Sequence, residues 1–282
     1  MNLKNIIPKD GPTIDGVEKY INKYTDEIIV IKCGGSVLLE PDLFEKFLED
    51  ISVINKLGLN VVVVHGGGKK IKKKLDEKNI KSKFIDGLRI TDSKTIKIVE
   101  EALTELNSDI IKKLIFKECK AQPVTARKNN IIKTTPEKKE LFFVGKPKNI
   151  EKKNLLEIIK KKEVPVVVPM GIGEDNKIYN INADVAAGAI AKILNSRRLL
   201  LMTDVEGVLD KNNELVTEIN SDFANKMIKN GTIIGGMIPK INTCIDAVKN
   251  GVTGVVIVDG RKKHSILFEL LSVKGAGTLI RK

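Results

Sequence analysis

The chain has 282 residues, of which 42% are hydrophobic and 30% charged, enough apolar material for one large domain or two smaller ones. No apolar run approaches the roughly 20 residues that a membrane-spanning helix requires, which excludes a membrane span. The three cysteines, Cys33, Cys119 and Cys244, are widely spaced among only two histidines, so disulfide scaffolds and structural zinc sites are not expected. We expect a cytoplasmic protein, because residues 1–27 show no secretory signal or transit peptide.

The sequence carries 49 basic and 36 acidic residues, for a formal net charge of +13. Such an excess can indicate a nucleic-acid partner. Here the lysines are scattered among acidic residues, and with no tryptophan and 4% aromatic residues there is no stacking platform for bases. We interpret the excess as a solvated surface suited to small anionic substrates, and a nucleic-acid partner is the alternative.

Short runs rich in Val and Ile alternate with stretches of helical period, which is typical of a parallel sheet covered by helices. We therefore predict an α/β protein, a three-layer αβα sandwich with a central, mostly parallel sheet. The expected strands are residues 28–33, 59–64, 164–169, 199–203 and 255–258, and the expected helices are 42–57, 69–78 and 184–194. Between residues 123 and 144 the short runs 131–134 and 141–144 instead predict β-hairpins.

A short amphipathic helix is expected before this pattern, at residues 13–25. Its apolar face is formed by four side chains, Val17, Tyr20, Ile21 and Tyr24. Two arrangements are open, because this face either folds back on its own domain or packs against another subunit. We divide the chain into an N-terminal arm, a first lobe and a second lobe, at residues 1–27, 28–194 and 195–282.

Glycine clusters follow the first two predicted strands, at Gly34-Gly35 and Gly66-Gly67-Gly68. Glycine at a strand-to-helix turn lets backbone N–H groups approach a phosphate closely, and the helix N-terminus adds a favourable dipole. Turn formation alone is the alternative, but both clusters fall at the strand ends where open α/β sheets bind ligands. Neither has the spacing of a P-loop or of a GxGxxG dinucleotide site, so a Walker ATPase or Rossmann dehydrogenase is not supported.

Two lysines accompany these glycines. Lys32 lies inside an otherwise apolar strand directly before its glycine pair, and Lys240 follows a later glycine pair. Two lysines beside a phosphate would neutralise charge on a transferring phosphoryl group. Their candidate partner is Asp184, which faces the same way as Asn180 and Asn182 if residues 179–184 alternate; a helix N-cap is its alternative role.

In this order, these motifs resemble those of the acetylglutamate kinases, within the amino acid kinase superfamily. The resemblance covers residues 17–280 and rests on six segments, IKCGG (31–35), VHGGG (64–68), GLRITD (87–92), YNINAD (179–184), TDVEGVLD (203–210) and GTIIGGMIPK (231–240). It implies the amino acid kinase fold and ATP-dependent phosphorylation of the side-chain carboxylate of N-acetyl-L-glutamate. The product would be an acyl phosphate in arginine biosynthesis.

The resemblance also implies roles for single residues. Lys32 and Lys240 would stabilise the phosphoryl group, and Asp184 would orient both lysines. Arg89 and Asn180 would hold the amino acid substrate. The glycines expected to cradle the γ-phosphate are Gly34, Gly35, Gly66 and Gly67. The residues expected at the nucleotide are Thr203, Asp204, Val208, Leu209 and Asp210. Mg²⁺ would be held mainly by the phosphates of ATP, with no protein metal site.

Both ends of the chain resemble the arginine-inhibited members of this family, whose N-terminal helix joins dimers into a ring-shaped hexamer. The resemblance lies in the arm helix and in two C-terminal segments, HSILFE (264–269) and GAGT (275–278). It implies a homo-hexamer, a trimer of dimers, and an arginine site at Tyr20, His264, Glu269, Gly275 and Gly277. A solvated helix-end histidine is the alternative for His264.

Two segments depart from the family pattern. Residues 126–129, Ala-Arg-Lys-Asn, stand where Gly-Lys-Asp-Gly is usual, and residues 105–107 lack the usual glycine. Because the hairpin region closes over the amino acid in this family, we expect the departures to bear on acceptor specificity. The alternatives are a kinase for another acidic amino acid derivative, such as a carrier-bound aminoadipate or aspartate, and a catalytically silent arginine-sensing protein. The retained Lys32, Asp184 and Lys240 argue against the silent protein.

Overall fold

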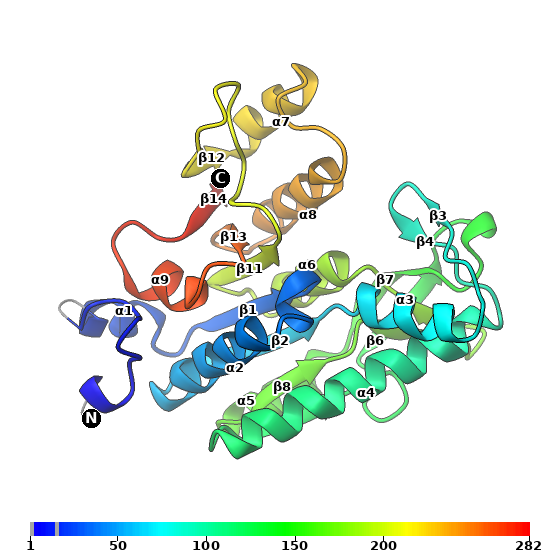
Figure 1. Cartoon of the computed structure of the whole chain (residues 1–282), viewed down its shortest axis with the longest axis horizontal. Coiled ribbons are helices and arrows are strands. Elements are labelled where there is room, and N and C mark those ends of the chain that lie inside the picture. The colour runs from blue at the N-terminus through cyan, green and yellow to red at the C-terminus, as the bar shows by residue number, and fades with distance from the viewer. Residues whose placement is uncertain (1–2, 15–16) are drawn as a thin grey trace.

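The computed structural model describes residues 3–14 and 17–282. Its centre is an eight-stranded sheet in the order β12-β14-β13-β11-β1-β2-β8-β5 (Figure 1). These strands are β1 (Ile28–Cys33), β2 (Asn60–His65), β5 (Ala121–Val124), β8 (Val164–Val167), β11 (Arg198–Thr203), β12 (Glu218–Asn220), β13 (Val255–Asp259) and β14 (Gly277–Arg281). All neighbours pair in parallel except β13 and β14, which confirms the mostly parallel sheet.

Helices cover both faces of this sheet. One face carries α1 (Val17–Tyr24), α2 (Pro41–Lys56), α4 (Thr95–Phe116) and α9 (Ser265–Leu271). The other carries α5 (Lys152–Lys160), α6 (Ala183–Ile193), α7 (Ser221–Lys229) and α8 (Met237–Lys249). Because strand residues alternate between faces, Ile29 and Ile31 of β1 pack with the first group and Val30 with the second. The predicted three-layer αβα sandwich is confirmed.

The predicted strands and helices of the sandwich are observed within two residues of their expected bounds. The helix after β2 is α3 (Gly68–Glu77), which packs against α4. The helix expected at 13–25 is observed as the shorter α1. Residues 13 and 14 are not helical, and residues 15 and 16 lie outside the described residues.

The hairpin prediction needs a correction. Residues 141–144 do not form its second strand, because the 3₁₀ helix η3 (Lys139–Leu141) ends at Phe142, whose φ of +54° turns the chain. Instead β6 (Ile132–Pro136) pairs antiparallel with β7 (Gly145–Ile150). These strands form a second sheet with β9 (Met170–Gly173) and β10 (Ile178–Asn180), beside the small hairpin β3 (Phe84–Ile85) and β4 (Leu88–Arg89).

The arm helix α1 packs on its own chain, beside α9 at one end of the molecule (Figure 1). Val17 and Tyr24 are buried in the same core as α9. Tyr20 and Ile21 are half-buried against that core. Of the two arrangements left open by the sequence, folding back on the domain is therefore observed, and part of the apolar face stays at the surface.

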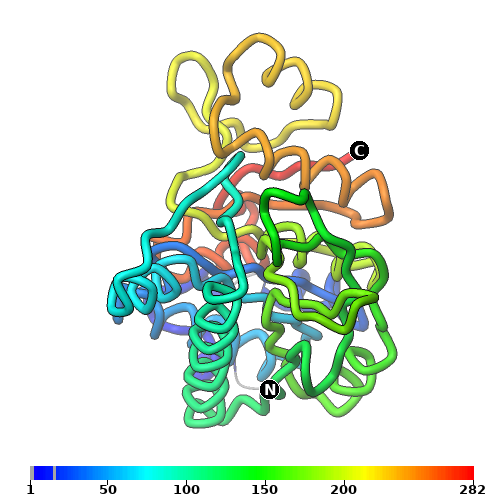
Figure 2. The backbone as a smooth tube through the Cα atoms, turned by 90° about the vertical axis from the view of Figure 1, so that its right-hand side faces the viewer, coloured from blue at the N-terminus to red at the C-terminus, as the bar shows by residue number. Residues whose placement is uncertain are grey.

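The central sheet crosses the predicted lobe boundary at residue 195, because β1 pairs with β2 on one side and β11 on the other. Figure 2 shows most of the segments after this boundary, yellow to red, in the upper part of the view, and most of the blue to green segments that precede it in the lower part. The division into 28–194 and 195–282 stays a prediction.

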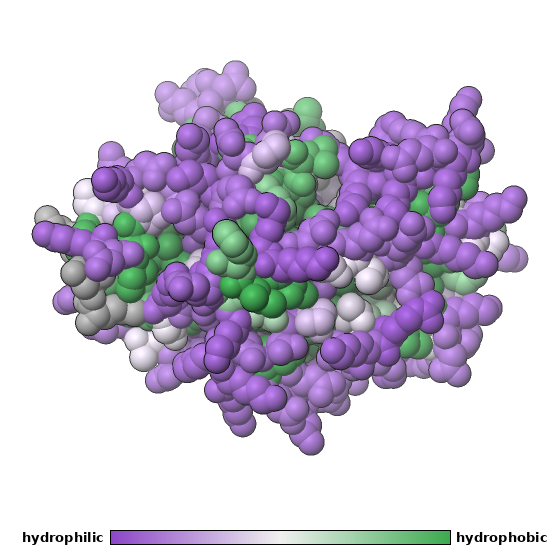
Figure 3. Space-filling view, turned by 60° about the horizontal axis from the view of Figure 1, so that its bottom comes forward, coloured by the Kyte–Doolittle hydropathy of each residue, from purple (hydrophilic) through white to green (hydrophobic). Residues whose placement is uncertain are grey.

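The surface view in Figure 3 is mostly hydrophilic, with hydrophobic groups gathered in separate patches. Many surface lysines lie beside carboxylates. Lys74, for example, contacts Glu101 and Glu105, each with an Nζ–Oε1 distance of 2.6 Å. Among the described residues, none of the helices combines the length and apolar character needed to cross a membrane.

Candidate active site

Two glycine turns form one wall of the pocket that contains Lys32, Asp184 and Arg89, which has a volume of about 230 Å³. Gly34 and Gly35 follow β1, and residues 66–68 follow the neighbouring strand β2. Position 35 favours glycine, because its φ is +63° and an added Cβ would lie 2.5 Å from Oδ1 of Asp204. The prediction that both turns meet at one edge of the sheet is confirmed, since both line this pocket.

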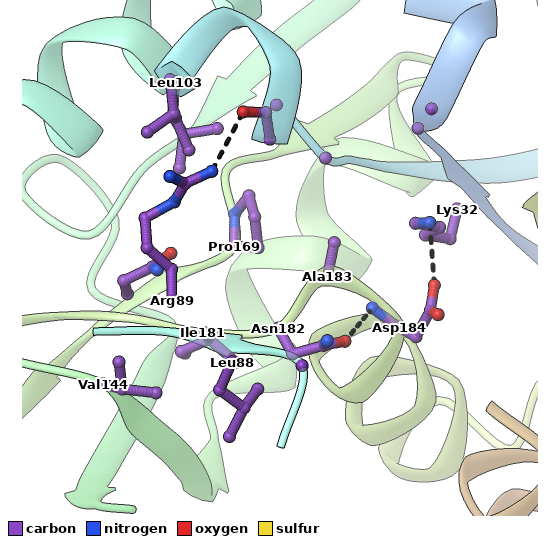
Figure 4. A pocket seen from close by; sticks show the side chains of 18 of the residues that line it. Lys32, Leu88, Arg89, Leu103, Val144, Pro169, Ile181, Asn182, Ala183 and Asp184 are labelled. Atoms are coloured by element: carbon purple, nitrogen blue, oxygen red, sulfur yellow. Dashed lines mark hydrogen bonds and ion pairs between the residues drawn. The ribbon is translucent and has the colours of Figure 1, made fainter. Parts of the chain in front are cut away.

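Asp184 lies between the two predicted lysines. Its Oδ1 is 2.9 Å from Nζ of Lys32, which comes from β1 (Figure 4). Its Oδ2 is 2.6 Å from Nζ of Lys240, on α8. Burial opposes ionisation of Asp184, but the two ammonium groups hold its pKa at about 2. The carboxylate is therefore charged at neutral pH and fixes both lysines in place.

The N-cap of α6 is Asn182, so the alternative role considered for Asp184 is wrong. The side-chain oxygen of Asn182 accepts hydrogen bonds from the backbone N–H groups of Asp184 and Val185, at 2.9 and 3.2 Å. An asparagine cap satisfies the helix terminus. The Asp184 carboxylate is consequently left free to bind the lysines. An asparagine directly before an Ala-rich helix was the available sequence signal for this cap.

Arg89 lies at the opposite end of the pocket from Lys32 and Asp184 (Figure 4). Its guanidinium donates to the carbonyl of Gly68 at 3.1 Å and to the Ser82 hydroxyl, and it lies 4.7 Å from the ring centre of Phe84. Burial lowers the pKa of Arg89, but an arginine stays charged in proteins. Asn180, at the end of β10, lines the same pocket.

A second cavity, of about 310 Å³, adjoins the first on the side of Lys240. Asp184 and Asn182 line both cavities. Gly236, at the start of α8, belongs to the second cavity alone. The Lys32–Asp184–Lys240 group thus lies where two cavities meet, which suits transfer of a group from a ligand in one to a ligand in the other.

The predicted nucleotide residues separate into two sets. Thr203 is the last residue of β11, and Asp204 directly follows it. Asp204 accepts hydrogen bonds from the amide and hydroxyl of Ser36, after the first glycine turn, at 3.1 and 2.7 Å. Val208 is buried, and its amide donates to Thr278. Sequence reasoning missed Ser36, although a hydroxyl residue directly after a glycine pair was a usable signal.

The other two residues of that segment belong to a loop. Leu209 forms a β-bridge with Leu215, and the Asp210 carboxylate accepts hydrogen bonds from the amides of Asn212 and Glu214, at 2.8 and 2.9 Å. None of the five predicted nucleotide residues, in either set, lines the two cavities described above. The nucleotide role of residues 203–210 stays a prediction.

Part of the predicted arginine site comes together at the turn after α9. Glu269 accepts a hydrogen bond from the amide of Ala276 at 2.8 Å, and burial raises its pKa. Gly275 has φ +67° and passes so close that an added Cβ would lie 2.7 Å from this carboxylate. At position 277, close packing of the backbone requires glycine, because an added Cβ would lie 2.0 Å from the Ile257 carbonyl oxygen.

His264 is buried, so its interpretation as a solvated helix-end residue is wrong. Its Nδ1 is 2.5 Å from Oδ1 of Asp50, on α2, and its Nε2 is 3.1 Å from Oδ1 of Asp10. Burial opposes its charge, but these carboxylates raise the pKa of His264 above its ordinary value. Glu269 is therefore not the hydrogen-bond partner of His264. The sequence gave no signal of the contacts with Asp50 and Asp10, because these residues lie far from His264 along the chain.

The departure at residues 126–129 lies away from the pocket that contains Arg89. Arg127 pairs with Glu100 of α4, and Asn129 accepts a hydrogen bond from the amide of Thr125 at 3.1 Å. This loop helps line a separate cavity against α4. The pocket that contains Arg89 and Asn180 is lined instead by residues such as Val144 and Leu88.

Residues 27–259 match the sequence model of the amino acid kinase family. The acetylglutamate kinase of Pelagibacter ubique is 57% identical over 99% of this chain and 97% of its own length. The acetylglutamate kinase of Clostridioides difficile is 43% identical over 93% of this chain and 94% of its own length.

Solved structures agree in fold. An N-acetylglutamate synthase from Neisseria gonorrhoeae, 20% identical, has a TM-score of 0.86 over 95% of this chain and 62% of that one. A carbamate kinase from Giardia lamblia, 19% identical, has a TM-score of 0.65 over 91% of this chain and 98% of that one. Fold, paired lysines and family match together define an α/β phosphotransferase of the amino acid kinase class. Within that class the chain belongs to the acetylglutamate kinases.

Proposed function

We propose that the first cavity holds the acceptor, that the phosphates of ATP enter from the second, and that the phosphoryl group passes between Lys32 and Lys240. The reaction is the ATP-dependent phosphorylation of the side-chain carboxylate of N-acetylglutamate. The observation that carries this assignment is the position of Asp184, bound to both lysines where the two cavities meet.

An acceptor carboxylate oxygen attacks the γ-phosphorus, and the bond from that phosphorus to the oxygen bridging to the β-phosphate breaks, which releases ADP. A carboxylate is already ionised at neutral pH, so the reaction needs no general base. Asp184, with a pKa of about 2, would be a poor base in any case. Its role is to hold the lysines.

Charge is the main obstacle, because both reactants are anions. Lys32 and Lys240 place two positive charges beside the transferring group, fixed before the substrates bind. Preorganised donors of this kind are a large source of catalysis in phosphoryl transfer. The glycine turns after β1 and β2 add backbone N–H groups at the same place.

The acceptor is recognised at the far end of the first cavity. Arg89 supplies a charged guanidinium there, which suits the α-carboxylate of an acylated acidic amino acid. Asn180 supplies an amide that can bind the acyl or carboxylate oxygens. An acceptor with carboxylates at both ends fits a cavity that has cations at both ends.

Mg²⁺ would accompany the nucleotide. Within residues 3–14 and 17–282, no three or more His, Cys, Asp or Glu side chains gather as a metal cage. Mg²⁺ commonly keeps several waters and binds through substrate phosphates. We therefore propose that the ATP phosphates supply most of its ligands, and that it neutralises part of their charge.

We also propose that arginine inhibits the enzyme by binding between α1 and the turn after α9. The half-buried Glu269 carboxylate offers a partner for a guanidinium, and Lys23 and Tyr24 of α1 lie near it. The half-buried Tyr20 and Ile21 leave apolar surface on α1 that would join dimers into a hexamer. We place the enzyme in the cytoplasm, where ATP is supplied.

An acceptor panel tests the substrate. ADP release would be measured with N-acetylglutamate, N-acetylaspartate, aspartate and an acylated aminoadipate, and N-acetylglutamate is expected to give the highest kcat/KM. Turnover with another acid but not with N-acetylglutamate would contradict the assignment. Arginine binding without turnover on any acceptor would favour the silent sensor, and salt-sensitive binding to DNA or RNA would favour the nucleic-acid alternative.

A further inference from the structure

His65 and Asn107 form a buried polar pair beneath the second glycine turn. His65 is the last residue of β2, and Asn107 lies on α4. Both side chains are buried, with exposed fractions of 0% and 1%. Nδ1 of His65 is 2.8 Å from the carbonyl oxygen of Gly66, and Nε2 is 3.2 Å from Nδ2 of Asn107.

The hydrogen bonds of this pair define the tautomer of His65. Nδ2 of Asn107 lies 2.9 Å from the carbonyl oxygen of Val166 in β8, so it is an N–H donor. Its second N–H points to Nε2 of His65, which therefore accepts. Nδ1 must then carry the proton and donate to Gly66. Burial lowers the pKa of His65 to about 4, which keeps the ring neutral.

The bond to Gly66 controls the next amide. The Gly66 carbonyl and the Gly67 N–H belong to one planar trans peptide group, so they point in opposite directions. The Gly66 N–H is already used, because it donates to the Cys33 carbonyl at 2.6 Å. The Gly67 N–H lies at the unpaired start of α3, and Gly67 lines the pocket.

We infer that His65 and Asn107 are positioning residues, which orient the Gly67 N–H toward the phosphoryl group as it is transferred. The inference rests on the proposed function. Asn107 holds the orientation of the His65 ring, and the ring holds the orientation of the Gly66 carbonyl. That carbonyl sets the direction of the Gly67 N–H, which belongs to the same peptide group. Such an amide acts mainly in the transition state, so its loss lowers kcat more than it raises KM.

Two variants of His65 test separately the two hydrogen bonds that the ring makes, one with Gly66 and one with Asn107. In His65→Asn, the side-chain amide nitrogen takes the place of Nδ1 and can still donate to Gly66. In His65→Gln, the amide oxygen takes the place of Nε2 and keeps the contact with Asn107, but the donor to Gly66 is lost. We expect kcat to fall by about 10²-fold in His65→Gln and to stay within about fivefold in His65→Asn.

Thermal unfolding of both variants measures the stability cost separately from kcat. Equal losses of kcat in the two variants, or a change confined to KM, would overturn the inference. Absence of turnover in the unaltered protein would instead contradict the proposed function, and the tautomer of His65 can still be measured.

That measurement uses the whole, unaltered protein with ¹⁵N-labelled histidine, which has only two histidines to assign. At pH 7, NMR is expected to show a neutral Nδ1–H ring for His65. A neutral Nε2–H ring or an imidazolium would overturn the inference whatever the variants do.

Discussion

At the scale of single residues, the proposed catalysis depends on three side chains from three elements, Lys32, Asp184 and Lys240. Replacing either lysine with alanine is expected to lower kcat by about 10²-fold or more, because a fixed positive charge beside the transferring group is lost. Lys192→Ala is the matched control, since Lys192 also pairs with an aspartate, Asp246, but lies away from both cavities. Steady-state kinetics of the three variants test these roles. A loss of kcat in Lys192→Ala similar to that in the two other variants would contradict them.

Arg89 should behave differently from the lysines. In the proposed complex it binds a part of the acceptor that does not change charge during transfer, so Arg89→Ala is expected mainly to raise the KM for N-acetylglutamate. Arg127→Ala, which removes an exposed guanidinium from the loop outside the pocket, should leave this KM unchanged. An Arg89→Ala variant with unchanged KM and a kcat loss equal to that of Lys240→Ala would rule out the proposed division of labour.

A functional residue could be predicted from the sequence where its polarity did not fit the pattern of its neighbours. A lysine inside an apolar strand, as at Lys32, is expensive without a partner, so its presence indicated a site. Partners brought together only by tertiary packing gave no such signal. Asp50 and Asp10 around His264, and Asn107 against His65, lie far apart in sequence and look like ordinary helix or loop residues.

At the scale of elements, the N-terminus of α6 holds Asp184 in place through the Asn182 cap. Asn182→Ala is expected to lower the free energy of unfolding by about 1 kcal/mol and also to lower kcat, because the Asp184 backbone loses its anchor. Asn220→Ala removes a similar cap, which accepts from the amide of Phe223 on α7. It should cost similar stability with unchanged kcat. Chemical denaturation and kinetics of both variants test this, and equal kcat values in the two would refute it.

Most elements were predictable because buried strands and amphipathic helices have distinct periods. β1 and α2 are examples, each within a residue of its expected bounds. The hairpin strand near 141–144 was misplaced because its apolar run Leu141–Val144 resembles a strand. The turn that displaces it depends on the φ of Phe142, a backbone angle that residue type does not encode.

At the scale of the whole molecule, we propose that α1 connects assembly with regulation. Removing residues 1–25 would test this connection, but it would also remove the buried Val17 and Tyr24 and so open the core. Tyr20→Ala combined with Ile21→Asp changes only half-buried side chains. The double variant is expected to remain an active dimer, to lose the hexamer and to lose arginine inhibition.

Glu18→Ala, at an exposed position on the same helix, should change neither property. Light scattering and arginine titrations of activity measure both properties on the same samples. A hexamer that persists in the double variant, or a dimer that arginine still inhibits fully, would contradict the connection. The sequence predicted the helix and its apolar face, but not that Val17 and Tyr24 are buried against α9, because periodicity does not identify the packing partner.

The most direct test of the account is to trap the acyl phosphate. The enzyme would be incubated with Mg·ATP, N-acetylglutamate and hydroxylamine, and the resulting hydroxamate would be identified by mass spectrometry beside a Lys240→Ala control. The account predicts the γ-hydroxamate of N-acetylglutamate in amounts equal to the ADP released, and about 10²-fold less with the variant. ADP release without hydroxamate, or equal hydroxamate from the Lys240→Ala variant, would contradict it.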